Sequence, residues 1–482
     1  SFNAREFMKR EKTAFVTFLK FPPEVLGLML LFVAGLGLRL YRLAVPAMWI
    51  DEIGVLEAAS QSAWQQAVAV AKGHIMGMPL HYLQTWAAAQ LGLHNEWLRL
   101  PDALWGSLTI LLGYRLAKFY VEKPAALITA ALIATSPLLI RYSQELRFYA
   151  ALYFFYLLLI YSALQALEKR GWLRWLAVTL IGMTGILFHI YTITALVFVY
   201  AALLTRPQWR SLRNLRSLLT VTILLLGFFG WAAVEFGSVP GYRTPLFALE
   251  KPLNFVLRGL GLAPIHSPRG ATLLYYLLLV IGFAAGVAGA LKARRTALLI
   301  PLLAGLALIA VILGMNWYRH YFVHSRQIYY LSYWVYLLAA AGLCSLFGRL
   351  ARRLSFLQKN QTRFAVGGTI LILALCSLPA LLQYYHAERS ITKSGYAPLL
   401  EHWQAGDWIC VIPDFDAFVF QTYWKEALGP WLLSCDHKEI FQNPQVKFVI
   451  ASEEMDFSPA FREIYRPPAD TFYPKRIWMR VE

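Results

Sequence analysis

Two adjacent carboxylates, Asp51 and Glu52, follow the first long apolar run of the chain, and a third, Glu145, lies in a very short loop between two later runs. A carboxylate can serve as a general base or help to hold a divalent cation. One member of the pair could equally cap a helix that starts nearby, and Glu145 could simply pair with a neighbouring arginine. The residues alone leave these interpretations open.

Cationic and aromatic side chains in the same class of loop could bind a phosphate or a sugar, because the arginine fork matches phosphate oxygens. The candidate binding residues are Arg147, Tyr149, His81, Tyr82, His189, Arg243, Arg319, Tyr321 and Arg326. Taken singly, they could also be snorkelling anchors or members of an aromatic belt. If the protein uses a divalent cation (Mg, Mn or Zn), we expect Asp51 and Glu145 to hold it, although no ligand spacing decides this.

The elements that must position these residues are membrane spans. The chain is 58% hydrophobic and 15% charged, with a mean hydropathy of +0.50, far from the composition of a soluble domain. Successive apolar runs reach about 20 residues, the length of a helix that crosses the hydrocarbon core. We predict an α-helical polytopic membrane protein with about eleven spans. They fall near residues 25–43, 98–119, 125–140, a fourth ending near 167, 176–188, 191–204, 218–236, 273–291, 297–315, 328–347 and 366–382.

The distribution of Lys and Arg predicts the orientation. The formal net charge is +18, but the basic residues lie in alternate short loops, which indicates positive-inside topology and attraction to anionic head groups rather than nucleic-acid binding. The pattern predicts a cytoplasmic N-terminus with a basic flank at 1–23, and an extracytoplasmic C-terminus, in a plasma or inner membrane. Arg39 and Arg42 run against the pattern. We expect the first apolar run to be a retained span and not a cleaved signal.

Two segments lie outside the predicted spans. In the long outer loop 45–98, stretches 55–71 and 79–91 are short and moderately apolar, so we expect helices lying along the membrane interface. The composition changes after residue 386, and we divide the chain into a transmembrane domain (1–386) and a small extracytoplasmic α/β domain (387–482).

Within the second domain, residues 406–413 predict a turn followed by a buried strand, 447–451 a short apolar strand, 417–426 a helix and 477–481 an edge strand. Cys410 and Cys435 could pair if this domain is extracytoplasmic. Cys344 and Cys376 fall in apolar runs and are expected to be packing residues. No glycine-rich nucleotide-binding motif occurs.

Several motifs together resemble the GT-C membrane glycosyltransferases. They are the acidic pair after the first span, Met78-Pro79-Leu80-His81-Tyr82, Leu98-Arg99-Leu100-Pro101-Asp102-Ala103-Leu104-Trp105-Gly106, Ser143-Gln144-Glu145-Leu146-Arg147-Phe148-Tyr149, and Arg326 followed by Tyr329-Tyr330. The resemblance covers roughly residues 25–345. The relatives it suggests are protein O-mannosyltransferases, the lipid A aminoarabinose transferase and bacterial polyprenyl-phosphate-sugar transferases.

This resemblance implies an inverting transfer of a sugar from a polyprenyl-phosphate donor to a hydroxyl of a lipid, glycan or protein acceptor outside the membrane. It implies that Asp51 is the general base, that Glu52 and Glu145 line the same cavity, and that Arg326 holds the leaving phosphate. Partial burial and a like-charged neighbour would raise the pKa of Asp51 toward neutrality. The chain departs from its relatives at Gln327–Tyr333, where many of them are proline-rich.

Other function classes remain as alternatives. A flippase or transporter for the same lipid would need ionisable residues inside the spans and inverted repeats, and the runs hold few charges and no evident repeat. A lipid-binding scaffold subunit would make the acidic pair incidental. Within the enzyme class, a ligase that uses a diphosphate donor is the rival.

Overall fold

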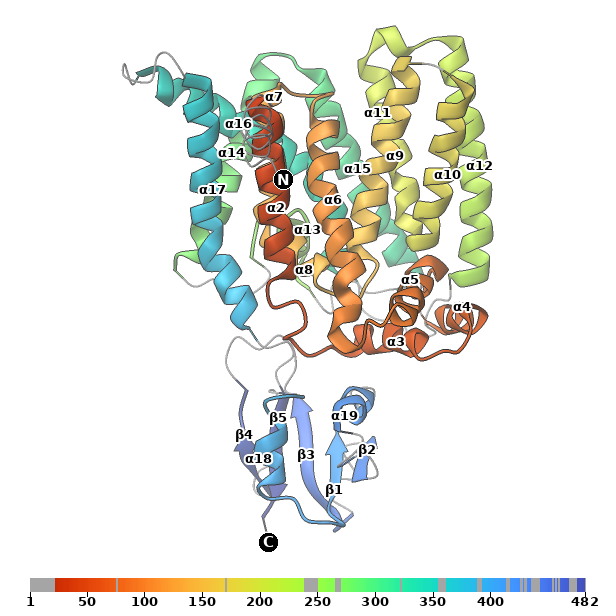
Figure 1. Ribbon diagram of the computed structural model, residues 1–482, viewed down its shortest axis with the longest axis vertical. Helices are drawn as coiled ribbons and strands as arrows, with labels where there is room; N and C mark the ends of the chain where they lie inside the picture. The colour runs from red at the N-terminus through yellow and green to blue at the C-terminus, as the bar shows by residue number, and fades with distance from the viewer. Residues whose placement is uncertain are drawn as a thin grey trace, which may run out of the picture.

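The structure, a computed structural model, has a long helical bundle and a smaller unit of strands and helices beyond one end of it (Figure 1). It describes the chain apart from residues 1–21, 75–76, 170, 238–249, 265–269, 321–322, 354–360, 388–391, 413–416, 425–427, 429–430, 435–442, 453–454, 456, 458–459, 468–474 and 482. Most of the predicted basic flank, together with Arg243, Tyr321 and Cys435, therefore lies outside the described residues.

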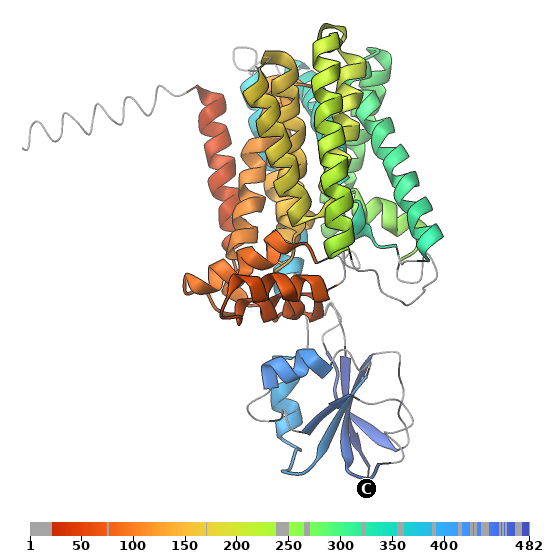
Figure 2. The same cartoon turned by 90° about the vertical axis from the view of Figure 1, so that its right-hand side faces the viewer.

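The bundle is made of helices that run nearly lengthwise (Figures 1 and 2). They are α2 (Pro23–Leu40), α6 (Leu100–Ala117), α7 (Lys123–Thr135), α9 (Tyr149–Lys169), α10 (Trp172–Phe188), α11 (Ala195–Thr205), α12 (Leu212–Phe236), α14 (Thr272–Lys292), α15 (Thr296–Arg319), α16 (Ser332–Arg353) and α17 (Gln361–His386). Among the described residues, seven helices are long and apolar enough to cross a membrane, or eight if α7 and the short α8 (Pro137–Ser143) form one span.

The count of eleven spans is therefore not confirmed. α10 and α11 are apolar but shorter than the seven candidate spans, and α6 is not among the candidates. The break between α7 and α8 has a local cause: Ser136 is extended, its hydroxyl accepts a hydrogen bond from Leu139 N, and Pro137 starts the new helix. Because proline disfavours helical backbone in the residue before it, the axis bends by 55° at this point.

The long loop between α2 and α6 forms short helices at one end of the bundle (Figure 1). They are α3 (Ile50–Ala59), α4 (Trp64–Gly73), α5 (Pro79–Gln90) and the 3₁₀ turn η1 (Asn95–Arg99). The single helix predicted over 55–71 is wrong. The chain turns between α3 and α4, where Gln66 accepts from the Ser62 hydroxyl at 2.9 Å and from Ala63 N at 3.3 Å.

The smaller unit, which we call the tail, comprises the described residues from 392 to 481. Its five-stranded sheet has the order β2-β1-β3-β5-β4, with β1 (Trp408–Val411), β2 (Leu432–Ser434), β3 (Val446–Ser452), β4 (Phe461–Tyr465) and β5 (Lys475–Arg480). β1 is parallel to β2 and β3, and β5 is antiparallel to β3 and β4. The predicted α/β character is confirmed.

Both faces of this sheet are covered. Helices α18 (Tyr396–Leu400) and α19 (Ala417–Trp424) pack on the face that carries Ile477, and Trp478 packs on the other face. The edge-strand prediction for residues 477–481 is therefore wrong, because β5 lies between two partners. Cys410 of β1 is disulfide-bonded, whereas Cys344 and Cys376 are free.

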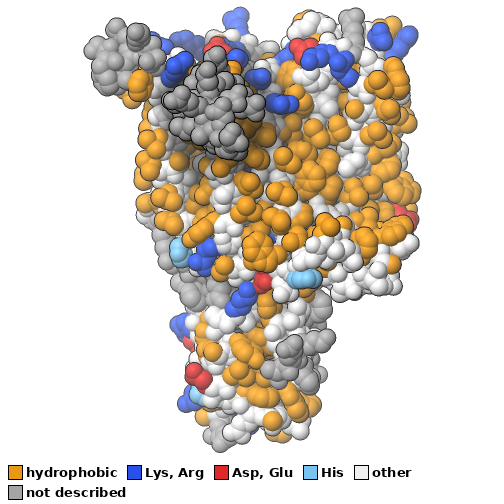
Figure 3. Space-filling model, viewed as in Figure 1, with side chains coloured by type: hydrophobic (Ala, Val, Ile, Leu, Met, Phe, Trp, Pro, Cys, Tyr) orange, Lys and Arg blue, Asp and Glu red, His pale blue; other side chains and the backbone are white. Residues whose placement is uncertain are grey.

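The two ends of the bundle differ in charge. Figure 3 shows Lys and Arg side chains gathered at the end remote from the tail, and the flank between the ends is largely hydrophobic. An apolar belt between polar ends is the surface that a bilayer requires of a multi-pass protein. The helices α3–α5 and the tail share the less basic end.

Candidate active site

Asp51 lies in the first turn of α3 and faces two guanidinium groups. Arg326 Nη1 donates to Asp51 Oδ2 at 2.9 Å, and Arg147 Nη2 is 3.8 Å from the same oxygen. Burial raises the pKa of Asp51, but the positive charges of Arg147 and Arg326 outweigh it, so the net pKa is below its usual value. The predicted shift toward neutrality is wrong. Asp51 is ionised at neutral pH and remains 27% exposed.

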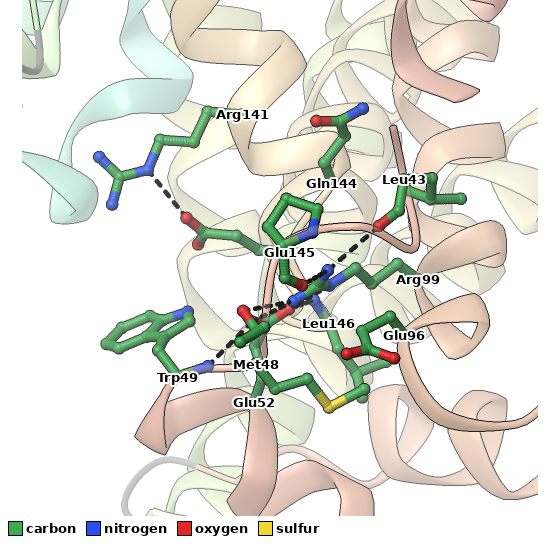
Figure 4. Close-up of polar contacts among 12 residues, drawn as sticks. Leu43, Met48, Trp49, Glu52, Glu96, Arg99, Arg141, Gln144, Glu145 and Leu146 are labelled. Carbon is green, nitrogen blue, oxygen red and sulfur yellow. Dashed lines mark hydrogen bonds and ion pairs between the residues drawn. The ribbon is translucent and has the colours of Figure 1, made fainter. Parts of the chain in front are cut away.

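The adjacent carboxylate, Glu52, is fully buried and points toward Arg99 (Figure 4). Arg99 donates to both of its oxygens at 2.7 Å, from Nε and from Nη2. Leu146 N donates to Oε1 at 2.7 Å, and Trp49 N donates to Oε2 at 3.3 Å, which caps α3. A neutralised neighbour cannot raise the pKa of Asp51 as a free charge would. The resemblance implies that Glu52 lines the same cavity as Asp51, but these contacts hold it in a buried ion pair instead.

Arg99 also binds the backbone of the segment that leads into α3. Its Nη1 donates to the carbonyls of Leu43 and Pro46 at 3.1 and 2.8 Å, and its Nη2 donates to that of Ala47 at 3.2 Å. The sequence places Arg99 in a motif but predicts no role for it. Its position directly before a span could have indicated a structural role, because a buried charge there needs a partner.

Glu145 comes from the turn that follows α8, and its side chain is 2% exposed. Arg141 Nε donates to Glu145 Oε1 at 2.8 Å (Figure 4), so the ion pair left open by the sequence is present. The preceding residue fixes this turn: Gln144 Nε2 donates to the carbonyls of Arg39 and Tyr41 at 2.8 Å each. The turn then places Arg147 beside Asp51, where Arg147 Nη1 also donates to the Asp51 carbonyl at 3.2 Å.

Arg326 reaches Asp51 from the 3₁₀ turn η4 (Ser325–Gln327), which a buried carboxylate anchors. Glu250 Oε2 accepts from Ser325 N at 2.7 Å, and Arg258 of α13 (Pro252–Gly259) lies 3.7 Å from Oε1. Glu250 is not among the residues predicted from the sequence. It could have been recognised as the sole acidic residue of the outer loop 237–271.

His324 precedes this turn, and Arg326 N donates to its Nδ1 at 3.3 Å. Burial and the positive charges of Arg326, Arg141 and Arg258 lower the pKa of His324 to about 3. The imidazole is therefore neutral at physiological pH, and the charge of this wall of the site comes from its arginines.

Two predicted residues on α5, His81 and Tyr82, are buried close enough to Arg147 for its charge to affect their pKa. Burial and the Arg147 charge lower the pKa of His81 to about 3, so its ring is neutral. Burial raises the pKa of Tyr82 to about 12, so its hydroxyl keeps its proton and can donate. The Tyr82 ring stacks on His74 with centroids 5.7 Å apart.

Aromatic rings form the wall on the bundle side. Tyr149 begins α9 and packs against Tyr142 with centroids 4.6 Å apart. Phe148 stacks on His189 at 4.0 Å, and the Arg147 guanidinium lies 5.1 Å from the Phe148 ring centroid. A flat, apolar and partly hydrogen-bonding wall beside cations is a surface suited to a sugar phosphate.

Of the remaining predicted binding residues, only Arg319 is described, and it does not join this cluster. Arg319 is exposed at the last turn of α15 and makes no hydrogen bond or ion pair with any described residue. As noted, Arg243 and Tyr321 are among the residues not described.

A divalent cation does not fit the carboxylates as they stand. Asp51 is engaged by Arg326, and Glu145 by Arg141, and a guanidinium beside a carboxylate repels a metal ion. Within the described ranges, no group of three or more His, Cys, Asp or Glu side chains is placed to hold a metal. No step of the chemistry below runs through one.

Comparison with known proteins places this arrangement in a fold. Residues 77–233 match the family model of dolichyl-phosphate-mannose-protein mannosyltransferases. ArnT from Cupriavidus metallidurans in the apo state superposes with a TM-score of 0.57 at 14% identity, over 95% of this chain and 98% of that one. The chain has the GT-C glycosyltransferase fold. No curated protein matches the sequence.

Two further GT-C structures were determined with lipid phosphates. ArnT bound to undecaprenyl phosphate matches with a TM-score of 0.51 at 15% identity, over 94% of this chain and 98% of that one. The oligosaccharyltransferase AglB from Archaeoglobus fulgidus, in complex with an inhibitory peptide and a dolichol-phosphate, matches with a TM-score of 0.51 at 13% identity, over 91% of this chain and 70% of that one.

Proposed function

We propose that this protein transfers a sugar from a polyprenyl-phosphate donor to an acceptor hydroxyl, with inversion at the anomeric carbon, at the extracytoplasmic face of the membrane. The observation that carries the proposal is the cluster of Asp51 with Arg147 and Arg326, at the end of the bundle that carries the interfacial helices. It offers an ionised carboxylate beside cations that suit a phosphate. The fold, and the lipid phosphates in the ArnT and AglB structures, support the choice of donor.

In the reaction we propose, the Asp51 carboxylate takes the proton of the acceptor hydroxyl as its oxygen bonds to the anomeric carbon. The bond from that carbon to the phosphate oxygen breaks, and its electron pair goes to the phosphate. Arg326 and Arg147 stabilise the charge that develops there. The products are the inverted glycoside, the polyprenyl phosphate and protonated Asp51.

Because Asp51 pairs with Arg326 and Arg147 before the donor binds, donor binding also affects the pKa of Asp51. A donor phosphate competes with Asp51 for Arg326 and Arg147, and each guanidinium that turns to the phosphate stops lowering the pKa of Asp51. Donor binding therefore makes Asp51 a stronger base when the sugar is in place. This coupling limits proton abstraction when no donor is bound.

The orientation rests on charge. Lys and Arg gather at the end of the bundle remote from the tail (Figure 3), whereas α3, which carries Asp51, lies at the tail end (Figure 1). The positive-inside rule assigns the basic end to the cytoplasm. The tail is then extracytoplasmic and the acceptor reaches the site from outside. Cysteine labelling from outside should succeed beside residue 51 and fail beside residue 210.

The decisive experiment is a transfer assay with purified protein in liposomes and a synthetic polyprenyl-phosphate sugar, comparing wild type with Asp51→Asn. The variant keeps the shape of the side chain but loses the base, so we expect turnover to fall by a factor of about 100 or more. Arg319→Gln serves as the control, because its side chain is exposed and outside the cluster. Transfer by Asp51→Asn at the wild-type rate refutes the base assignment. Translocation of the lipid without transfer favours a flippase.

A further inference from the structure

The tail contacts the bundle at the segment that carries Asp51. Figure 2 shows the tail beyond the helices α3–α5. Tyr423 of α19 forms the centre of the contact: Met48 N donates to its hydroxyl at 2.6 Å, and the hydroxyl donates to Glu96 Oε1 of η1 at 3.0 Å. Met48 is three residues before Asp51 in the chain.

A second tail residue reinforces this contact. Lys393 Nζ pairs with the same carboxylate oxygen of Glu96 at 2.8 Å and donates to the carbonyl of Val45 at 3.1 Å. Val419 of α19 is buried in a hydrophobic cluster with Met48 and Leu146. One face of the tail thus binds both the segment before α3 and the turn before α6.

The segment 43–49 needs these contacts because it has no regular secondary structure to hold it. It forms neither helix nor strand, and side chains hold several of its backbone groups: Arg99 binds three of its carbonyls from the bundle side. Tyr423 and Lys393 bind a further amide and a further carbonyl from the tail side. Backbone that lacks regular hydrogen bonds opens at low free-energy cost unless other groups bind it.

We propose that docking of the tail through Tyr423 positions the segment 43–49, and with it the carboxylate of Asp51, against Arg147 and Arg326. Tyr423 is then a positioning residue: it acts on the reaction through the backbone of Met48 and contacts no substrate. The tail becomes part of the active-site architecture. A partner or acceptor that displaces the tail would release the segment that carries Asp51. The catalytic part of this inference rests on the proposed function.

Two measurements on the full chain in nanodiscs test the proposal. The variant Tyr423→Phe keeps the ring and removes the hydroxyl that joins Met48 N to the charged Glu96. We expect the amides of residues 43–50 to exchange deuterium about 10-fold faster, from the usual strength of a hydrogen bond to a charged group. We expect kcat to fall by a similar factor while the donor KM changes less than twofold, because the phosphate-binding arginines are untouched.

The matched control is Tyr465→Phe, which removes a tyrosine hydroxyl bonded at 2.6 Å to Ser394 Oγ inside the tail. It should leave both readouts at the wild-type values. Lys393→Met provides a second variant, and it should also speed amide exchange in residues 43–50. Unchanged exchange in 43–50 for Tyr423→Phe and Lys393→Met overturns the positioning role. Faster exchange in a protein whose wild type transfers no sugar overturns the proposed function instead and leaves the docking intact.

Discussion

The ion pair between Asp51 and Arg326 yields a prediction whose size follows from the geometry. At the 2.9 Å between Arg326 Nη1 and Asp51 Oδ2, Coulomb's law gives about 1.4 kcal/mol in water and about 6 kcal/mol at an effective dielectric constant of about 20. Both side chains are about a quarter exposed, so solvent screening favours the lower part of this range, about 1.5–3 kcal/mol. This is the free energy by which the ion pair favours the ionised form of the Asp51 carboxylate and so lowers its pKa.

We therefore expect Arg326→Gln to raise the pKa of Asp51, because the carboxylate loses a positive charge that lowers it. Because the base must be ionised, the acid limb of the pH profile of kcat/KM moves to higher pH. Above this limb, the donor KM still rises by a factor of about 10–100, since the phosphate loses a charged hydrogen-bond donor.

The lowered pKa of Asp51 also determines how the ion pair's contribution to stability changes with pH. The pKa of Asp51 in the folded protein lies below its unfolded value, so the ion pair contributes stability above the unfolded pKa of about 4 and loses it as pH falls through the folded pKa. Arg326→Gln should consequently lower the unfolding temperature more at pH 7 than at pH 3.

Two variants control this experiment. Arg326→Lys keeps the charge but not the fork, so the acid limb should return toward the wild-type position while the donor KM stays high. Arg319→Gln removes an exposed arginine outside the cluster and should change neither. An acid limb that stays in place in Arg326→Gln refutes the claim that this pair sets the pKa of Asp51.

Two further predictions concern the residues that hold the site in place. Glu52→Gln leaves Arg99 without its buried charged partner and should destabilise the protein by about 3–5 kcal/mol. The Glu52→Gln, Arg99→Met double variant should lose less stability. Thermal unfolding of the purified variants measures both losses, and equal losses would contradict the prediction. Glu250→Gln weakens the acceptor for Ser325 N, and we expect the donor KM to rise about 10-fold with kcat nearly unchanged; steady-state kinetics checks this, and a fall in kcat alone would show that Glu250 does not act through the phosphate-binding turn.

Much of the bundle could be predicted because the length of an apolar run is a local property. The fourth predicted span, ending near residue 167, and the helix α9 (Tyr149–Lys169) agree closely at that end, since lipid leaves the backbone no hydrogen-bond partners outside its own helix. The failures are also physical. The break before Pro137 depends on one dipeptide inside an apolar run, and the position of β5 in the sheet depends on strands whose pairing the periodicity of one strand cannot reveal.

The candidate site shows the same division. The sequence pointed to the candidates Asp51, Glu145, Arg147 and Arg326 because they lie in predicted outer loops, where charges are few. It could not identify the anchors Glu250 and Tyr423, whose partners lie far away in the chain: Tyr423 is 375 residues from Met48. Residue type and spacing alone do not report contacts of that separation.

The sequence by itself determined that this is a multi-pass helical protein with a carboxylate pair just after its first span, because hydrophobicity and charge are written along the chain. Only the tertiary structure decided which member of that pair is available. Glu52 is taken by Arg99 and Leu146, which are 47 and 94 residues away, and Asp51 faces Arg326, 275 residues away. Adjacent residues of a helix point in different directions, so folding separates two like charges into a buried anchor and a partly exposed carboxylate.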